Sequence, residues 1–94
     1  MEQMPSIELL EAFHRFPGPY MFKAIGKVEN GFIARVVAAV RQELDFIADP
    51  PFRVRQTTGG RHVAVTLEPT LQTADQVLAV YRRLRTTAGL VMLL

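Results

Sequence analysis

The stretch "FRVRQTTGGRHVAVTLEP", residues 52–69, carries the strongest fold signal in the chain. Side chains of different character alternate over residues 52–57 and again over residues 61–68, which is the two-residue period of a β-strand. Between them, Gly59-Gly60 can adopt the positive φ angles of a tight turn, and Pro69 closes the second strand. The stretch therefore predicts an antiparallel hairpin.

A helix is predicted on each side of this hairpin. The first begins after Asn30, the expected N-cap, and its apolar side chains recur at helical spacing: Ile33, Val36, Val37, Val40 and Leu44. The second begins at Thr73, which forms a capping-box pattern with Gln76, and Gly89 is its expected C′ residue. Its apolar stripe consists of Val77, Val80, Tyr81, Leu84 and Ala88.

The outer segments supply two more strands and a short leading helix. The pattern "YMFKAIGK", residues 20–27, is aromatic and apolar with a two-residue period, and residues 90–94 are long enough for a final strand. Ser6 can cap a short helix that extends to Phe13. The turn at residues 17–19 prevents this helix from continuing.

The predicted order is therefore strand, helix, strand, strand, helix, strand. This is the α+β, ferredoxin-like βαββαβ arrangement. Right-handed crossovers place both helices on one face of a four-stranded antiparallel sheet, with strands 20–27 and 61–68 at its centre. We expect a single domain over residues 1–94, in which residues 1–16 form an N-terminal extension that frays.

Composition and charge fit a soluble globular protein. The chain has 94 residues, is 49% hydrophobic, lacks cysteine and carries a net charge of +2. Residues 1–49 hold five basic and seven acidic side chains, whereas residues 50–94 hold six and two. The N-terminus has no secretory pattern, and "GLVMLL" is too short for a membrane helix. We expect a cytoplasmic protein.

The residues that usually carry chemistry are sparse. His14 and His62 are the two histidines, with no carboxylate at a metal-ligand spacing, and Ser6 is the single serine. No general base with an orienting partner can be named. We expect no metal, no cofactor, no catalytic residues and no enzymatic activity.

The face of the sheet opposite the helices is expected to be basic. If Phe22 and Ala24 face the helices, Lys23 points outward, beside His62 on the next strand. Arg53 and Arg55 extend the same face. Such a face can bind the phosphates of single-stranded nucleic acid, although the face has no outward Phe or Tyr on which bases could stack. It can equally be a solvated surface whose charges discourage pairing between sheet edges.

Four stretches resemble the YbeD-like family of small, uncharacterised bacterial proteins. They are "LLEAFHRFPGPYMFKAIGK" (9–27), "TTGGRHVAV" (57–65), "VLAVYRRL" (77–84) and "VMLL" (91–94). The family's Phe-Pro, aromatic strand, internal lysine and glycine correspond to Phe16, Pro17, Tyr20, Lys23 and Gly26. In the hairpin the family has a serine, a glycine, an aromatic residue and a small residue. This chain has the glycine (Gly60) and the small residue (Ala64), but it has threonine, at 57 or 58, in place of the serine and His62 in place of the aromatic residue.

The resemblance implies a ferredoxin-like fold similar to ACT regulatory domains. In that class, small molecules bind near the loop after the first strand, often between paired domains. Here the loop is "GKVENG", residues 26–31. Gly26 and Gly31 would let a ligand approach the backbone, and Asn30 could donate or accept a directional hydrogen bond. An ordinary strand-to-helix connection would need the same residues.

Three functions follow as hypotheses. The first is a non-enzymatic, ligand-sensing regulatory module that self-associates, as a homodimer for example, through a sheet edge or its open face. The second is nucleic-acid binding through Lys23, Arg53, Arg55 and His62. The third is an adaptor that binds a protein partner.

Overall fold

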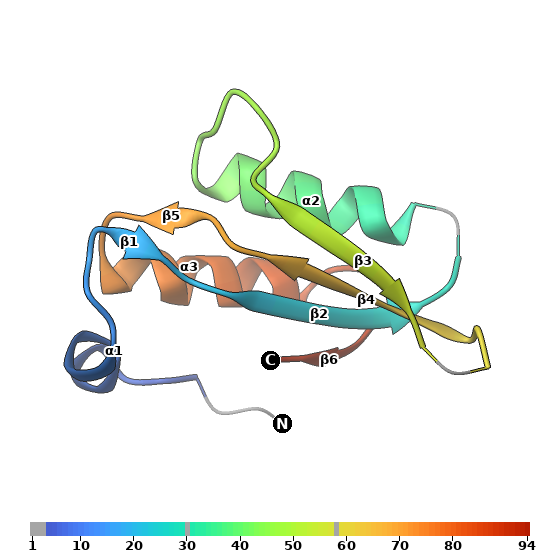
Figure 1. The fold of residues 1–94 in the computed structure, drawn as a ribbon, viewed down its shortest axis with the longest axis horizontal. Coiled ribbons are helices and arrows are strands. Elements are labelled where there is room, and N and C mark those ends of the chain that lie inside the picture. The colour runs from blue at the N-terminus through green and yellow to red at the C-terminus, as the bar shows by residue number, and fades with distance from the viewer. Residues whose placement is uncertain (1–3, 30, 58) are drawn as a thin grey trace.

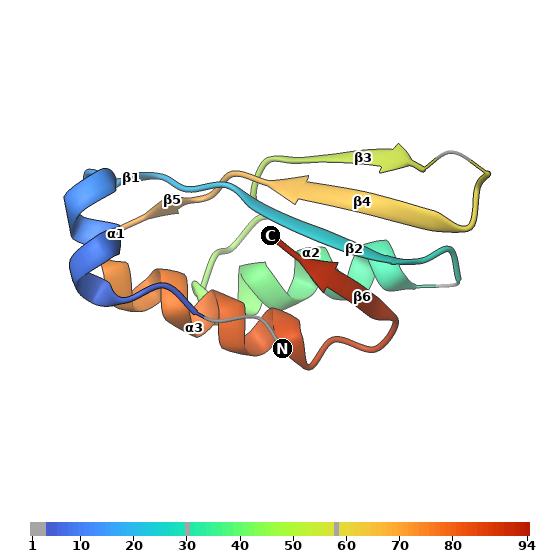
Figure 2. The same cartoon turned by 90° about the horizontal axis from the view of Figure 1, so that it is seen from below.

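A four-stranded antiparallel sheet in the order β3-β4-β2-β6 forms one layer of the structure, and two helices form the other (Figures 1 and 2). The computed structural model describes residues 4–29, 31–57 and 59–94. The strands are β2 (Phe22–Lys27), β3 (Phe52–Gln56), β4 (His62–Leu67) and β6 (Leu90–Leu93), and the helices are α2 (Phe32–Glu43) and α3 (Ala74–Arg85). The predicted ferredoxin-like βαββαβ order, with β2 and β4 central, is confirmed.

The N-terminal extension holds a short helix and contributes to a second, smaller sheet. Helix α1 (Ile7–Phe13) begins at the predicted cap, where Ser6 Oγ accepts a hydrogen bond of 3.1 Å from the Leu9 N–H. Beyond a cis Phe16–Pro17 peptide bond, β1 (Gly18–Pro19) pairs with β5 (Thr70–Leu71). Sequence periodicity missed this pair because two-residue strands are too short to show a period.

The predicted register of the central strands is confirmed. Phe22 and Ala24 are buried toward the helices, and Lys23 is exposed on the opposite face. Lys23 lies opposite Thr66 of β4. The side chains of β4 that point toward the helices, Val65 among them, are also buried. We call the sheet surface that faces away from α2 and α3 the open face.

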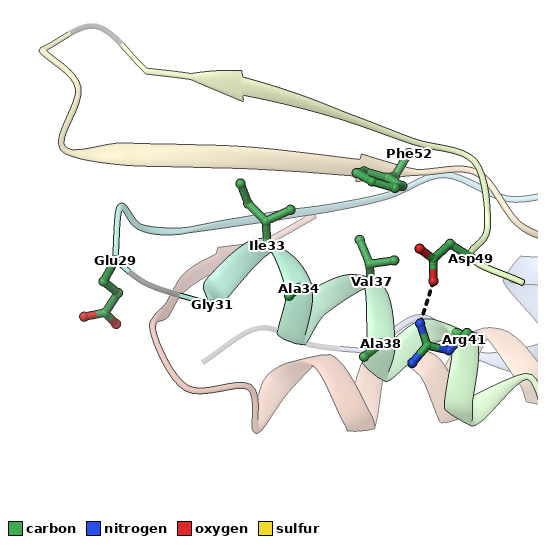
Figure 3. A pocket seen from close by; sticks show the side chains of 9 residues that line it. All are labelled: Glu29, Gly31, Ile33, Ala34, Val37, Ala38, Arg41, Asp49 and Phe52. Carbon is green, nitrogen blue, oxygen red and sulfur yellow. Dashed lines mark hydrogen bonds and ion pairs between the residues drawn. The ribbon is translucent and has the colours of Figure 1, made fainter.

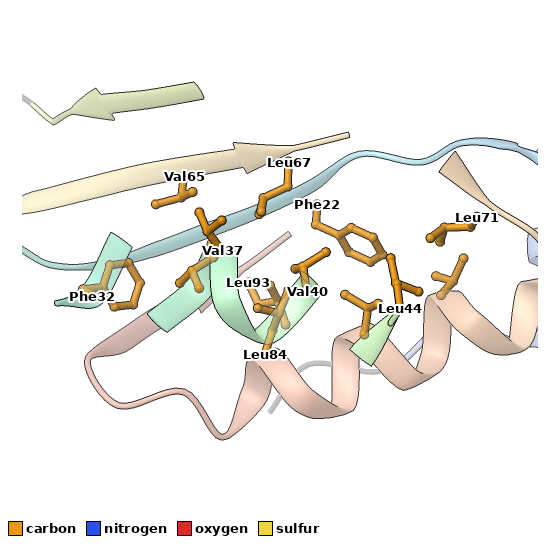
Figure 4. Close-up of a cluster of buried hydrophobic side chains, with 14 of the residues drawn as sticks. Phe22, Phe32, Val37, Val40, Leu44, Val65, Leu67, Leu71, Leu84 and Leu93 are labelled. Atoms are coloured by element: carbon orange, nitrogen blue, oxygen red, sulfur yellow. The ribbon is translucent and has the colours of Figure 1, made fainter. Parts of the chain in front are cut away.

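The core lies between the sheet and the two helices (Figure 4). Its largest fully buried side chains come from both layers and include Phe22, Phe32, Leu67, Leu71 and Leu84. Phe32, at the start of α2, packs directly on Gly26 of β2, where any added Cβ would lie within the ring's van der Waals radius. The absence of a side chain at Gly26 therefore fixes the helix start against the central strand.

The two long helices differ from the predictions in three respects: the N-cap of α2, the burial of Ile33 and the C-terminal end of α3. The predicted cap Asn30 lies outside the described residues, and α2 has Gly31 at its N-cap position, with φ of 88°. Ile33, expected in the core, is 37% exposed because Phe32 takes the inward position one residue earlier. Helix α3 has Thr86 as its C-cap, so Gly89 (φ 91°) is not a helix terminus and instead leads into β6.

The predicted cap of α3 is confirmed in a modified form. Thr73 Oγ1 accepts a hydrogen bond from the Gln76 N–H at 3.3 Å. Gln76 Oε1 accepts from the N–H of Gln72, at 2.6 Å, one residue before the capping-box position. Two orphan donors near the start of α3 are thereby satisfied.

Replacing Gly26 by alanine should destabilise the fold by about 1–3 kcal/mol, the usual cost of overpacking a filled core. The new Cβ would lie 2.6 Å from Phe32 Cε2 and nearer still to Cζ. Urea unfolding of Gly26→Ala, Phe32→Leu and the double variant measures the coupling. We expect the double variant to lose clearly less stability than the sum of the single losses. Simple additivity would show that the two residues do not share this constraint.

Candidate functional site

A groove runs between α2 and the edge strand β3 (Figure 3). It exists because the helices cover the central strands, whereas all five residues of β3 remain exposed. Phe52 and Val54 point to the helix side of the sheet, yet they are 43% and 44% exposed. The groove has a volume of about 590 Å³ and is lined by Glu29, Gly31, Ile33, Ala34, Val37, Ala38, Arg41, Asp49 and Phe52.

The walls of the groove are mainly apolar. Ile33 and Val37 project from α2 toward Phe52 at the start of β3, as Figure 3 shows. Ala34 and Ala38, on the same side of the helix, have side chains too small to fill the space. An apolar ligand part could therefore replace water here with a gain in free energy.

Charged groups that can meet a ligand stand at one end of the groove, where Arg41 and Asp49 lie (Figure 3). Glu29 borders the other end, near Gly31 at the start of α2, but its side chain points away from Ile33 and Phe52, and its Oε1 lies next to Gly89. Arg41 Nη1 donates to Asp49 Oδ1 at 2.5 Å, which ties the segment that precedes β3 to the helix. A guanidinium has five N–H donors, so Arg41 can bind a second acceptor as well. The arrangement suits a small molecule with an apolar body and an anionic end that Arg41 can bind.

The structure separates the predicted ligand-binding residues. Gly31 is exposed and lines the groove. Gly26 is buried, and the Phe32 ring occupies the space beside it, so the structure gives this glycine a packing role. Asn30 lies outside the described residues. The assignment of these three residues to a ligand stays a prediction.

Several groove residues were missed in the sequence. Ile33 and Val37 have the i, i+4 spacing of a core stripe, and nothing in the spacing shows that part of that stripe faces an uncovered strand. Phe52 carries the better signal. An aromatic residue on a strand rich in arginine suggests an edge strand, whose inner face the helices need not reach.

The open face brings together the four basic residues predicted on it. Lys23 and Arg53 flank Thr66 in one row across the sheet, and Arg55 lies opposite Ala64 in the next. His62 lies at the hairpin end of β4, opposite Lys27. Arg53 Nη1 also pairs with Glu68 Oε1 at 3.1 Å.

Apolar side chains occupy the other half of this face. Met92 of β6 lies opposite Ile25, and Met21, just before β2, is 51% exposed. Leu94 exchanges two backbone hydrogen bonds with Lys23, at 3.0 and 2.8 Å, and is 58% exposed. Among the described residues of the open face none is Phe, Tyr or Trp, so it lacks rings on which nucleic-acid bases could stack.

The described residues form neither a metal-binding cluster nor a membrane-spanning helix. Within residues 4–29, 31–57 and 59–94, no three histidine, aspartate or glutamate side chains gather closely enough to hold a metal ion. None of the described helices is long and apolar enough to cross a membrane.

Comparison with known proteins gives a family and a fold. The model of a family described as "Protein of unknown function (DUF493)" matches residues 11–94. The crystal structure of the ACT domain from GTP pyrophosphokinase of Chlorobium tepidum superposes with a TM-score of 0.59 at 13% identity, covering 81% of this chain and 94% of that one. No curated protein matches the sequence. The ACT-like fold that the resemblance implied is confirmed, and the chain belongs to a family of unknown function, as expected.

The Arg41–Asp49 ion pair should contribute little to global stability. Its side chains are 33% and 50% exposed, so water and salt screen the attraction. We expect Asp49→Asn to lower the free energy of unfolding by at most about 1 kcal/mol, and high salt to remove the difference. Urea unfolding at two salt concentrations tests this, with the nearby exposed Asp45→Asn as control. A larger loss that persists in high salt would instead indicate a structural role for Asp49.

Proposed function

We propose that this chain, which belongs to the family of unknown function DUF493 and resembles its YbeD-like members, is a non-enzymatic regulatory module that binds a small molecule in the α2–β3 groove. The observation that carries the proposal is an uncovered apolar groove with Arg41 and Asp49 at one end. The ACT-like fold supports it as an analogy of architecture.

The groove is of a size and composition suited to binding. Small-molecule sites are typically apolar concavities of roughly 300–1,000 Å³ with a few polar groups that set orientation. Here Ile33, Val37 and Phe52 form the apolar part, and Arg41 lies at one end. The ligand class that fits is a small carboxylate with an apolar body, its carboxylate toward Arg41.

The lining favours binding over catalysis. Of the nine described residues that line the groove, none is a serine, threonine, histidine, lysine or tyrosine. Its two carboxylates, Glu29 and Asp49, lie toward opposite ends, and Asp49 is engaged by Arg41. These groups can orient a ligand, but they do not form a nucleophile with an adjacent base.

Binding in this groove would act on the position of β3. The strand pairs only with β4, and its inner side chains Phe52 and Val54 lack a covering helix. A ligand that contacts Phe52 and α2 together would hold the edge strand against the helix. The signal would then be a change in the mobility of β3, which a partner can detect.

A thermal-shift screen with the twenty amino acids and carboxylate-bearing cofactor precursors tests the proposal. A ligand at a hundredfold excess over its Kd stabilises the folded state by about 2.7 kcal/mol, which raises Tm by several degrees in a domain of this size. We expect at least one compound with a carboxylate and an apolar body to do so, and a flat response across the panel would contradict the proposal.

A matched pair of variants locates the site. Ala34 is exposed on the groove side of α2, so Ala34→Trp should fill the groove without entering the core. We expect Ala34→Trp to lose the ligand-induced shift and Ala34→Ser, which leaves the groove empty, to keep it. A shift that survives Ala34→Trp would place the ligand elsewhere.

A further inference from the structure

Helix α1 presents an exposed surface that is both apolar and acidic. The residue it buries completely is Leu10. Leu9 and Phe13 are 55% and 76% exposed, and their i, i+4 spacing places them side by side. Glu8 borders this pair, about 100° from Leu9 around the helix, whereas the exposed Glu11 lies about 160° from both apolar side chains and faces away from them. A solvent-facing helix has no need of two large apolar side chains in contact, so this surface fits a binding partner better than water.

The open face has the complementary composition. Met21, Ile25 and Met92 supply apolar side chains on the side of β2 and β6. Lys23 stands at their border, and Arg55 extends the basic half onto β3. Exposed methionines adapt their shape to a partner because their side chains are flexible and polarisable.

We propose that the open face of one copy binds helix α1 of a second copy. Leu9 and Phe13 would pack on Met21, Ile25 and Met92, and Glu8 would face Lys23 and Arg55. The helix cannot reach the open face of its own chain, because Leu10 anchors it beyond the end of the sheet, beside β1, β5 and α3 (Figure 2).

Charge selects this occupant over two others. Pairing two open faces directly would set Lys23 and Arg55 of one copy against the same basic residues of the other, which is unfavourable. The phosphates of single-stranded nucleic acid would pair with the basic residues. Its bases, however, would find no aromatic side chain to stack on in the apolar half of the face, beside Met21 and Met92. An acidic helix with exposed Leu and Phe side chains satisfies both halves of the face.

The size of the contact favours a reciprocal dimer. A specific interface commonly buries about 800 Å² on each partner, roughly an eighth of the 6070 Å² accessible surface of this structure. A seven-residue helix alone is too small for that. A two-fold axis lets each copy supply both α1 and an open face, which doubles the buried area and closes the assembly as a dimer.

Sedimentation velocity over micromolar to millimolar protein, at low and high salt, measures the association. We expect a monomer–dimer equilibrium that weakens with salt. Glu8→Lys (the helix variant) and Lys23→Glu/Arg55→Glu (the face variant) should each weaken it at least about tenfold, since each opposes like charges. Leu9→Ser/Phe13→Ser should weaken it similarly at any salt. Asp75→Lys, which reverses a first-turn acid of α3, should have no effect.

Mixing the helix variant with the face variant is the decisive measurement. In the mixed dimer the lysine-bearing helix meets the glutamate-bearing face, and the unaltered helix meets the unaltered face. Both contacts are then complementary, so the mixture should dimerise more tightly than either variant alone. Circular dichroism of each variant verifies that it is folded.

Three results would overturn the proposal: a wild-type chain that stays monomeric at millimolar concentration, a dimer that the variants leave unchanged, or a mixture that does not recover. Binding of a single-stranded oligonucleotide that the face variant abolishes, with the protein monomeric, would assign the face to nucleic acid instead. None of these results bears on the groove, whose ligand screen can succeed or fail independently.

Discussion

The position of α2 depends on one close contact, the Phe32 ring on the backbone of Gly26. A glycine in a central strand normally weakens a sheet, because it packs no side chain. Here the missing side chain admits the ring of Phe32, and Gly89 borders the same ring, where an added Cβ would lie 3.2 Å from Phe32 Cδ1. This contact holds the start of α2 over β2 and next to β6. The helix therefore does not extend over β3, and the inner face of the edge strand is left uncovered.

Strand β3 takes part in both surfaces of interest. Phe52 lines the groove on the helix side, while Arg53 and Arg55 lie on the open face. The two-residue period of a strand allows this division, because successive side chains point to opposite faces. The small-molecule site and the proposed dimer surface thus lie back to back across a single strand. A ligand that steadies β3 from one side would also steady the basic residues on the other.

Much of the fold could be predicted from local patterns, whereas the groove could not. Periodicity located the helices and strands, and the alternation around Lys23 gave the correct register because only one choice buries Phe22 and Ala24. The error at Ile33 has a tertiary cause: Phe32 is fixed by Gly26, which turns the helix so that Ile33 faces outward. Gly89 adopts positive φ as predicted, but at the entry to β6 and not at the helix end. The groove combines a helix face with an uncovered strand, and no single segment encodes that juxtaposition.

The hairpin has a further consequence for how the chain can vary. At one end of β3, Arg41 holds Asp49; at the other, the Thr57 N–H and Oγ1 both donate to the His62 carbonyl, at 2.9 and 3.1 Å. Between these two fixed points, adding or deleting one residue would exchange the faces of β3, moving arginines into the groove and Phe52 to the outside. Related chains that keep both surfaces must therefore conserve the number of residues in this segment, and changes in length belong at the hairpin tip around Gly59 and Gly60.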